Sequence, residues 1–345
     1  MKDVAFIVQG QTFLKSMGPL LYFSNKADIR PNVFILQTRQ GKPYDNINLN
    51  TVQSILNNSP DNRVYMLNNQ SHIKDSLRKA GFDHFVCQDA QYHTRDICRK
   101  FRSFSIGVFF DTLHNAMRLS EEEALGPHKI YFPSEFFKNE YNKIVGKECN
   151  GESLGSPHLD HSIFIERKKR DRRSILFLTP IQETIPDSLA DEIEDLVYTC
   201  RDLDIEFHMK DRVKSPWKFK SEKTIKNIIT HSSESGMPYS SLSLILNTDA
   251  HITSYGTSVC EASFFGKPSV NIDVESHGNL TNEINWLKNV YDIEDIFNSE
   301  LCKTVQSGIL QAAIEQIVKG KPQEAILTYE NNSSLLILED IKKEV

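Results

Sequence analysis

One segment decides the fold of this chain: Ile252-Thr-Ser-Tyr-Gly-Thr-Ser-Val-Cys-Glu-Ala-Ser-Phe-Phe-Gly-Lys-Pro-Ser-Val-Asn-Ile-Asp273. The pattern predicts the end of a strand, a small polar turn, a short helix, and a Gly-Lys-Pro turn into a second buried strand. An apolar run just upstream, residues 242–246, is expected to be a further strand. The turn at 255–258 is then the junction of a strand end and a helix start, where open α/β sheets bind phosphates.

Four residues at this junction are candidate ligands of a nucleotide donor. Gly256 lets the backbone approach a phosphate closely, and Thr257 and Ser258 add hydroxyl donors near the positive end of the helix dipole. Glu261 lies one turn into the helix, where a carboxylate can accept a hydrogen bond from a ribose hydroxyl. The alternative is that Thr257 or Ser258 only caps the helix, because Ser and Thr are common N-caps.

The whole string Gly-Thr-Ser-x-x-Glu-Ala-x-x-x-Gly-Lys-Pro-x-x-x-Ile-Asp resembles the donor-nucleotide segment of GT-B-type enzymes. Relatives of that group include sugar- and polyol-phosphate-polymer transferases and UDP-N-acetylglucosamine 2-epimerases. In those families the polar turn holds the donor pyrophosphate and the glutamate holds the ribose. Two further segments, Ser-Glu-x-x-Lys at 134–138 and Gly-Ser-Pro-x-x-Asp at 155–160, are similar to segments of the same group and occur in the same order.

The composition indicates a soluble globular protein with one or two domains. The chain has 345 residues, of which 25% are charged and 39% hydrophobic, and its net charge is −6. Nucleic-acid-binding proteins usually carry a basic balance, so we expect no nucleic-acid partner. The first residues predict a strand rather than a signal peptide, and no run reaches the length of a membrane span, so a cytoplasmic location is expected. The six cysteines are scattered without a Cys-x-x-Cys spacing, which favours free, mostly buried thiols.

Strand-like and helix-like segments alternate along both halves of the chain, which predicts an α/β protein with two doubly wound, Rossmann-like domains. The expected parts are an N-terminal acceptor domain, a charged linker, a C-terminal nucleotide-donor domain and a final helix, over residues 1–165, 166–173, 174–325 and 326–345. The resemblance implies that the domains face a cleft, as in GT-B enzymes, and that the final helix packs back on the first domain. The basic run in the linker leaves a localisation signal or a lipid or nucleic-acid patch open as an alternative.

An apolar run at residues 105–110 predicts a strand, and Asp111 and His114 are then expected in a loop at its carboxyl end. His114 resembles the histidine that follows the corresponding strand in polyol-phosphate transferases, although Asn115 stands where those enzymes have glycine. Histidine titrates near neutral pH, so His114 or Asp111 is the candidate general base for an acceptor hydroxyl. A loop histidine bonded to a neighbour is the alternative.

A second polar segment, Glu206-Phe-His-Met-Lys-Asp-Arg212, ends a predicted strand of the second domain. Related transferases read Lys-x-His-Pro-(Arg/Lys) here, and the resemblance implies contacts from His208, Lys210 and Arg212 to donor phosphates. A solvent-facing charged loop is the alternative. His277 is a further candidate contact to the donor. There is no Asp-x-Asp motif in the donor position and no dinucleotide fingerprint, so neither a metal nor a nicotinamide cofactor is expected.

Together these features predict a transferase. It would move a sugar or a polyol-phosphate from a nucleotide sugar or CDP-polyol donor to a hydroxyl acceptor during surface-polysaccharide or glycolipid synthesis. The acceptor would be a glycan, a lipid-linked chain or a polyol-phosphate, which leaves open a peripheral contact with the inner face of the membrane. A UDP-N-acetylhexosamine 2-epimerase is the enzymatic alternative, although the acidic pair it needs is not evident in the first domain. The second alternative is a non-catalytic protein that binds a nucleotide sugar.

Overall fold

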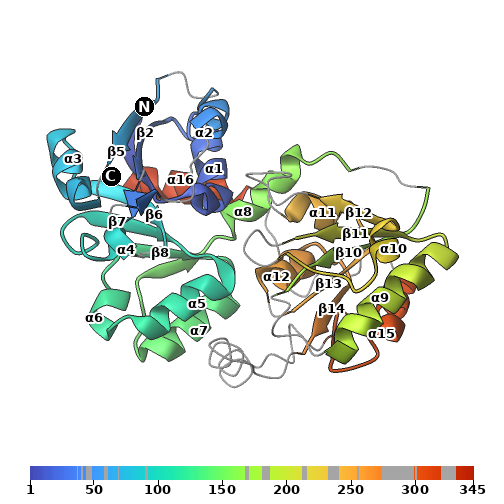
Figure 1. Cartoon of the computed structure of the whole chain (residues 1–345). Coiled ribbons are helices and arrows are strands. Elements are labelled where there is room, and N and C mark those ends of the chain that lie inside the picture. Colours follow the sequence, from blue (N-terminus) through green and yellow to red (C-terminus); the bar gives the residue numbers. More distant parts are fainter. Residues whose placement is uncertain are drawn as a thin grey trace. The chain divides into compact units, whose positions relative to one another are not determined.

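The chain folds into two compact units, Met1–His161 with Tyr329–Val345, and Ser162–Thr328 (Figure 1). The computed structural model describes residues 1–36, 38–39, 42–43, 49–57, 61–68, 70–89, 92–167, 171–180, 187–211, 216–231, 241–254, 256–273, 299, 301–319 and 332–345. The compact units divide after His161, a few residues before the charged run 166–173 in which we expected the linker.

The first unit contains a seven-stranded parallel sheet. Its strand order is β5-β2-β1-β6-β7-β8-β9. The bounds are Lys2–Val8 for β1, Ile29–Leu36 for β2, Arg63–Leu67 for β5, His84–Gln88 for β6, Arg102–Ile106 for β7, Lys129–Phe132 for β8 and Gly151–Ser153 for β9. The short strands β3, Thr38–Arg39, and β4, Lys42–Pro43, pair separately. The long apolar runs of β1 and β2 fit a sheet that is covered on both faces.

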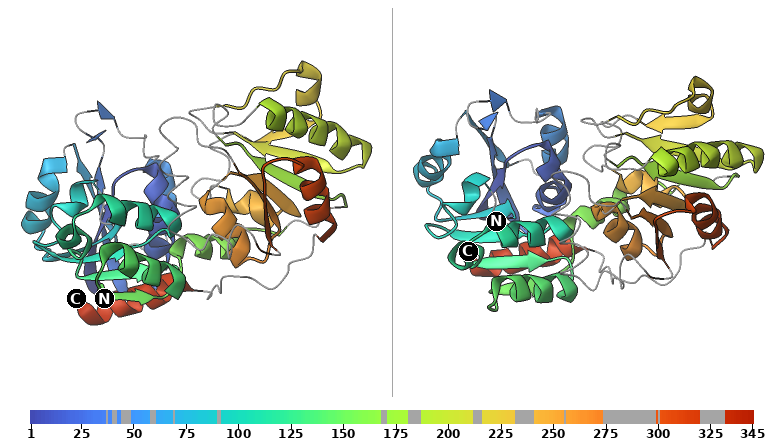
Figure 2. Two further views of the ribbon diagram at one scale, coloured as in Figure 1. Left: turned by 90° about the horizontal axis from the view of Figure 1, so that it is seen from below. Right: turned by 60° about the horizontal axis from the view of Figure 1, so that its bottom comes forward.

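Helices cover both faces of this sheet (Figure 2). On one face α1 and the C-terminal helix α16 share a core with Phe6, Val33 and Phe104. On the other face α3 packs near Phe85. The helix bounds are Leu14–Phe23 for α1, Leu49–Leu56 for α2, Ile73–Lys79 for α3, Tyr92–Arg95 for α4, Phe109–Arg118 for α5, Glu121–Ala124 for α6, Glu135–Val145 for α7, Pro157–Asp160 for α8 and Ser333–Glu344 for α16. Single 3-10 turns lie at Gln11–Phe13, Gln70–His72 and His161–Phe164.

The second unit contains a six-stranded parallel sheet in the order β12-β11-β10-β13-β14-β15. The strands are Ser174–Leu178 for β10, Glu206–Lys210 for β11, Ile228–His231 for β12, Ala250–Thr253 for β13, Ser269–Ile272 for β14 and Cys302–Val305 for β15. The apolar core on one face is closed by α9, Asp187–Asp202, and α15, Ile309–Lys319. The other face carries α11, Leu242–Leu246, and α12, Thr257–Phe264, while α10, Glu222–Ile225, precedes β12.

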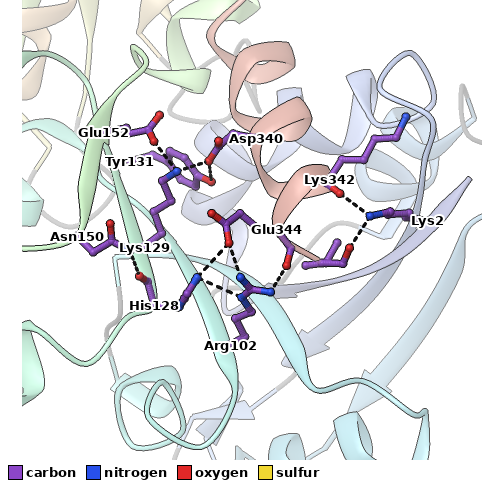
Figure 3. Close-up of polar contacts among 11 residues, drawn as sticks. Lys2, Arg102, His128, Lys129, Tyr131, Asn150, Glu152, Asp340, Lys342 and Glu344 are labelled. Atoms are coloured by element: carbon purple, nitrogen blue, oxygen red, sulfur yellow. Dashed lines mark hydrogen bonds and ion pairs between the residues drawn. The ribbon is translucent and has the colours of Figure 1, made fainter.

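The C-terminal helix α16 is tied to the first unit at both of its ends, and Figure 3 shows the contacts of its later part. At its start, the buried carboxylate of Asp160 accepts the backbone N–H groups of Ser333 at 3.2 Å and Ser334 at 2.6 Å. Further along, Asp340 accepts from Lys129 Nζ at 2.6 Å and from the Tyr131 hydroxyl at 2.7 Å. At its end, Glu344 pairs with Arg102 and His128, and Lys2 donates to the carbonyls of Lys342 and Val345. These contacts explain why residues far apart in the sequence form one unit.

Two sequence predictions of secondary structure are wrong. Residues 242–246 form helix α11 rather than a strand, because Leu242, Ile245 and Leu246 are buried at helical spacing. The strand expected at 105–110 is β7, which ends at Ile106, and Phe109 begins helix α5.

The cysteine prediction is confirmed, since all six are free and five are buried. Within the described residues, no helix has both the length and the apolar character needed to cross a membrane.

Candidate functional site

The N-terminus of helix α12 lies at the carboxyl end of β13, as the opening segment predicts. Gly256 is the N-cap residue, in extended conformation at φ −133° and ψ 161°, and no side chain caps the helix among the described residues. The alternative in which Thr257 or Ser258 caps the helix is therefore wrong, since both already lie within it. A Cβ on Gly256 would meet only ordinary contacts, with the nearest atom, Ser258 Oγ, at 3.5 Å. Packing within this unit therefore does not require glycine at this position. Tyr255 lies outside the described residues.

Glu261 lies in the same helix, and its side chain is buried against the sheet. Its charge acts on His251 of β13. Burial lowers the pKa of that imidazole to about 4, and the Glu261 carboxylate opposes the shift only in part. Neither His251 ring nitrogen has a hydrogen-bond partner among the described residues. A neutral histidine and a carboxylate thus lie together beneath the start of α12. The role of Glu261 toward a ribose stays a prediction.

His208 and Lys210 lie on β11 and are both buried. The alternation of side chains along a strand places them on one face, while Phe207 and Met209 join the core on the other. His208 Nδ1 lies 2.9 Å from His231 Nε2, and His208 Nε2 lies 3.1 Å from Glu206 Oε2. His208 and Lys210 thus belong to a strand, and the alternative that placed them in a solvent-facing charged loop is wrong. Arg212 and His277 lie outside the described residues.

Asp111 and His114 lie in helix α5 and not in the loop that the sequence predicted. The prediction failed because β7 ends four residues earlier than its apolar run suggests, and Phe109 and Phe110 serve helix packing against Phe137. Asp111 is exposed in the first turn of α5, and His114 is half-buried one turn further on. Their assignment as general base is not tested by this geometry.

A polar cluster lies at the carboxyl ends of β1 and β6; the sequence suggests Gln9 to Thr12 as part of the acceptor side, but the partners of Gln9 and the place of Asp89 were missed. The buried side chain of Gln9 donates to Thr94 Oγ1 at 3.2 Å, and Ser16 donates to Gln88. Asp89, also buried, accepts from Thr112 Oγ1 at 2.5 Å. The sequence indicates this cluster only through Gln9 and Asp89, single polar residues that directly follow apolar strands.

The backbone at this edge is strained. Asp89, with φ 36°, and Phe109, with φ 42°, both occupy the left-handed region, which costs non-glycine residues about 1–3 kcal/mol. Such strain is concentrated at functional sites in proteins, and ligands of parallel sheets bind at the carboxyl edge. We therefore include Asp89 and Gln9 in the candidate site of the first unit.

The Gly-Ser-Pro-x-x-Asp segment has a structural role. Pro157 begins α8, and Asp160 at its end holds the start of α16. The neighbouring imidazole of His161 lies 2.9 Å from the carbonyl oxygen of Lys15, which fixes α8 against α1. Burial, together with the nearby His158, lowers the pKa of His161 to about 3. This segment thus supports the fold rather than chemistry.

Comparisons with known proteins identify the fold. No protein-family model matches the chain, and no curated protein matches it in sequence. A putative UDP-N-acetylglucosamine 2-epimerase from Listeria monocytogenes is similar over 100% of this chain and 97% of its own, with TM-score 0.66 and 13% identity. The UDP-GlcNAc 2-epimerase from Methanocaldococcus jannaschii is similar over 99% of both chains, with TM-score 0.65 and 12% identity.

The wall teichoic acid polymerase TagF is similar over 99% of this chain and 90% of its own, with TM-score 0.57 and 10% identity. At these identities the TM-scores show that the chain shares the fold of these proteins. The predicted GT-B fold with two Rossmann-like α/β domains is thereby confirmed.

Proposed function

We propose that this GT-B chain is a transferase that moves a sugar or a polyol-phosphate from a nucleotide-activated donor to a hydroxyl acceptor in surface-polysaccharide or glycolipid synthesis. The observation that carries the proposal is the start of α12. The helix begins directly at the carboxyl end of β13, with a glycine as N-cap and two hydroxyl residues in its first turn. Backbone N–H groups and the helix dipole favour a phosphate at such a position.

In this proposal the second unit holds the donor. Gly256, Thr257 and Ser258 contact the pyrophosphate, and Glu261 accepts from the ribose. Lys210, which ends β11 two strands away, adds a positive charge at the same edge of the sheet. Arg212 and His277 remain proposed donor contacts on the basis of the sequence alone.

The first unit supplies the general base in this proposal. His114 or Asp111 of α5 removes the proton from the acceptor hydroxyl as its oxygen attacks the donor. A positioned base contributes roughly 10²–10⁴-fold to turnover, so His114→Ala is expected to lower kcat by that factor while donor affinity is retained. Asp111→Asn is the matched variant on the same helix. If His114→Ala keeps full activity and Asp111→Asn loses it, Asp111 is the base.

Nucleotide binding tests the donor assignment. Thermal shift of the full chain is measured with UDP, CDP, CMP and GDP, since a ligand at 100 times its Kd stabilises by about 2.7 kcal/mol. Gly256→Val is expected to abolish the shift without changing the melting temperature of the ligand-free protein. Glu261→Gln is expected to weaken binding by about 1–3 kcal/mol, and Glu222→Gln, exposed on α10, is its control. Undiminished binding by Gly256→Val would place the nucleotide elsewhere.

An epimerase acting on a UDP-N-acetylhexosamine is the second candidate. Buried Asp89 at the carboxyl end of β6 favours it, because epimerisation needs acidic groups that the sequence alone did not reveal in the first unit. Incubation with purified donors separates the candidates. Hydrolysis or transfer indicates the transferase, epimer formation indicates the epimerase, and binding without turnover indicates a binding protein.

A further inference from the structure

The outermost strand of the second sheet, β12, has backbone groups that no neighbouring strand takes up. It pairs in parallel with β11 on one side and is the last strand in the sheet order. Within the part of the chain that the structure describes, the backbone of residues 228–230 makes no hydrogen bond on the other side of the strand. Alternate residues of a strand direct their N–H and C=O groups away from the paired neighbour, so β12 presents polar backbone groups at the edge of the sheet.

The side chains of β12 leave this edge accessible. Ile229 is 43% exposed, and Thr230 beside it is exposed as well. Isoleucine and threonine are β-branched and favour extended backbone. The edge therefore combines an accessible backbone with exposed apolar surface and residues that suit a paired strand.

The other three outer strands carry a charged residue, which β12 does not. Arg63 begins β5, Glu152 is the middle residue of β9, and Lys303 lies in β15. Charged side chains on an outer strand oppose pairing with another chain. The only titratable residue of β12 is His231, whose ring lies against that of His208 at 2.9 Å between nitrogens. The edge of β12 thus lacks the protection that the other edges have.

A second copy of the same strand fits this edge. A twofold axis perpendicular to the sheet brings two β12 strands together in antiparallel orientation and keeps each face of the sheet on the same side. With the axis at Ile229, this residue lies opposite Ile229 of the second copy, and Ile228 lies opposite Thr230 of the second copy. Opposed Cβ atoms are about 5 Å apart, so the two exposed isoleucines cover each other and no like charges meet.

Other self-pairings are less favourable. A twofold axis at Glu152 of β9 or at Lys303 of β15 places two like charges opposite each other, which is destabilising. An axis at Thr230 of β12 places Ile229 opposite the second copy of His231, whose ring is already stacked on His208. The pairing centred on Ile229 is the one that joins neutral residues throughout.

We propose that two copies of this chain associate through β12, in antiparallel orientation and with Ile229 at the twofold axis, so that their six-stranded sheets become continuous. A strand of four residues is only about 13 Å long, whereas stable interfaces bury about 1,200 Å² or more, so the dimer is expected to be weak and to dissociate on dilution. Strands β11 and β10 separate β12 from β13, and the pairing uses none of the residues proposed to hold the donor. The dimer is therefore independent of the proposed function.

Analytical ultracentrifugation of the full chain tests the proposal. Concentrations from about 1 to about 500 µM cover the range in which small interfaces of low affinity dissociate. We expect the mass to rise with concentration from that of one chain toward that of two. Amides of β12 are expected to exchange more slowly with solvent at the highest concentration than at the lowest, whereas those of β5 should not change.

Charge variants at the axis test the pairing itself. Ile229→Lys and Ile229→Glu each place like charges opposite each other and are expected to weaken self-association at least about tenfold. An equal mixture of the two variants places opposite charges at the axis and is expected to restore association. Val64→Lys is the control, because Val64 is 39% exposed on β5, the outer strand of the other sheet, and its dimerisation should match that of the parent. Circular dichroism confirms that each variant is folded.

Several outcomes overturn the proposal. A parent chain that stays monomeric at every concentration does so, and so does self-association that Ile229→Lys leaves unchanged. Failure of the mixed lysine and glutamate variants to associate removes Ile229 from the axis. Loss of association in Val64→Lys instead would place the interface on the first unit. If a variant at Ile229 does not fold, the exchange measurement on the parent decides, because β12 amides whose exchange is independent of concentration contradict a contact at this edge.

Discussion

Removing the carboxylate of Asp160 is expected to loosen the C-terminal helix α16 from the first unit. The N-cap residue of this helix, Asn332, has φ 77° and makes no side-chain cap. The cap comes instead from Asp160, whose two oxygens each accept one backbone N–H of the first turn, at 3.2 Å and 2.6 Å. The carboxylate is fully buried and also faces the positive end of the helix dipole.

The size of the effect follows from these contacts. Losing an N-cap costs about 0.5–2 kcal/mol, and a buried donor left without an acceptor costs about 1–3 kcal/mol. The two costs describe partly the same loss and are not fully additive. Asp160→Ala is therefore expected to destabilise the first unit by about 3 kcal/mol. Asp160→Asn keeps one acceptor oxygen and should lose less. Glu339→Ala removes a carboxylate from the exposed face of the same helix and should change stability little.

Hydrogen exchange resolved to individual segments is the suitable assay, because two units need not unfold in a single transition. Amides of α16 and of the neighbouring β1 are expected to exchange faster in Asp160→Ala, whereas those of β10 and β11 should keep their protection. Equal exchange in α16 of Asp160→Ala and the parent protein would refute the reasoning.

Further predictions concern both units. Glu192 accepts the N–H of Gly308, which precedes α15, at 3.1 Å and that of Ile309, its first residue, at 2.6 Å, so Glu192→Ala should cost the second unit about 1 kcal/mol in urea unfolding. His161 has a pKa of about 3 when folded against an ordinary 6.5, so the unfolded state binds more protons below pH 6.5. Stability should therefore fall by about 2 kcal/mol between pH 7 and pH 5, and this loss should be absent in His161→Gln. A Cβ at Gly107 would lie 2.9 Å from the carbonyl oxygen of Tyr131, so Gly107→Ala should lower the melting temperature, whereas Gly256→Ala should not.

The sequence predicted the fold well where local pattern and tertiary packing agree. The apolar run at 174–178 predicts a strand, and it forms β10 with all five residues buried, as expected for the interior of a parallel sheet. The strand prediction for 242–246 failed because a five-residue run with four apolar side chains fits a buried strand and a buried helix equally well. Only the position of the segment against Leu176 selects the helix.

The candidate site was predictable in part for the same reason. The start of α12 could be located from its sequence, since glycine, threonine and serine between an apolar strand and a helical run define the junction locally. The chain of Glu206, His208 and His231 could not, because 23 residues separate the two histidines and only the pairing of β11 with β12 brings their rings together. The alternation of side chains along a strand places His208 on one face of the sheet, but it does not identify the residue beside it on the neighbouring strand.

The local sequence also does not reveal which residues cap the starts of the two C-terminal helices, α15 and α16. Asn332, the N-cap residue of α16, makes no side-chain cap, and Ile309 at the start of α15 donates to the distant Glu192, so the residue type before the helix does not identify either partner. Each receives a carboxylate from far along the chain, from Glu192 of α9 for the former and from Asp160 of α8 for the latter. A cap supplied in this way makes helix formation depend on prior folding of the unit that carries the carboxylate. For α16, this dependence links the last residues of the chain to the first unit. The stage of unfolding at which α16 is lost therefore reports whether α8 is still folded.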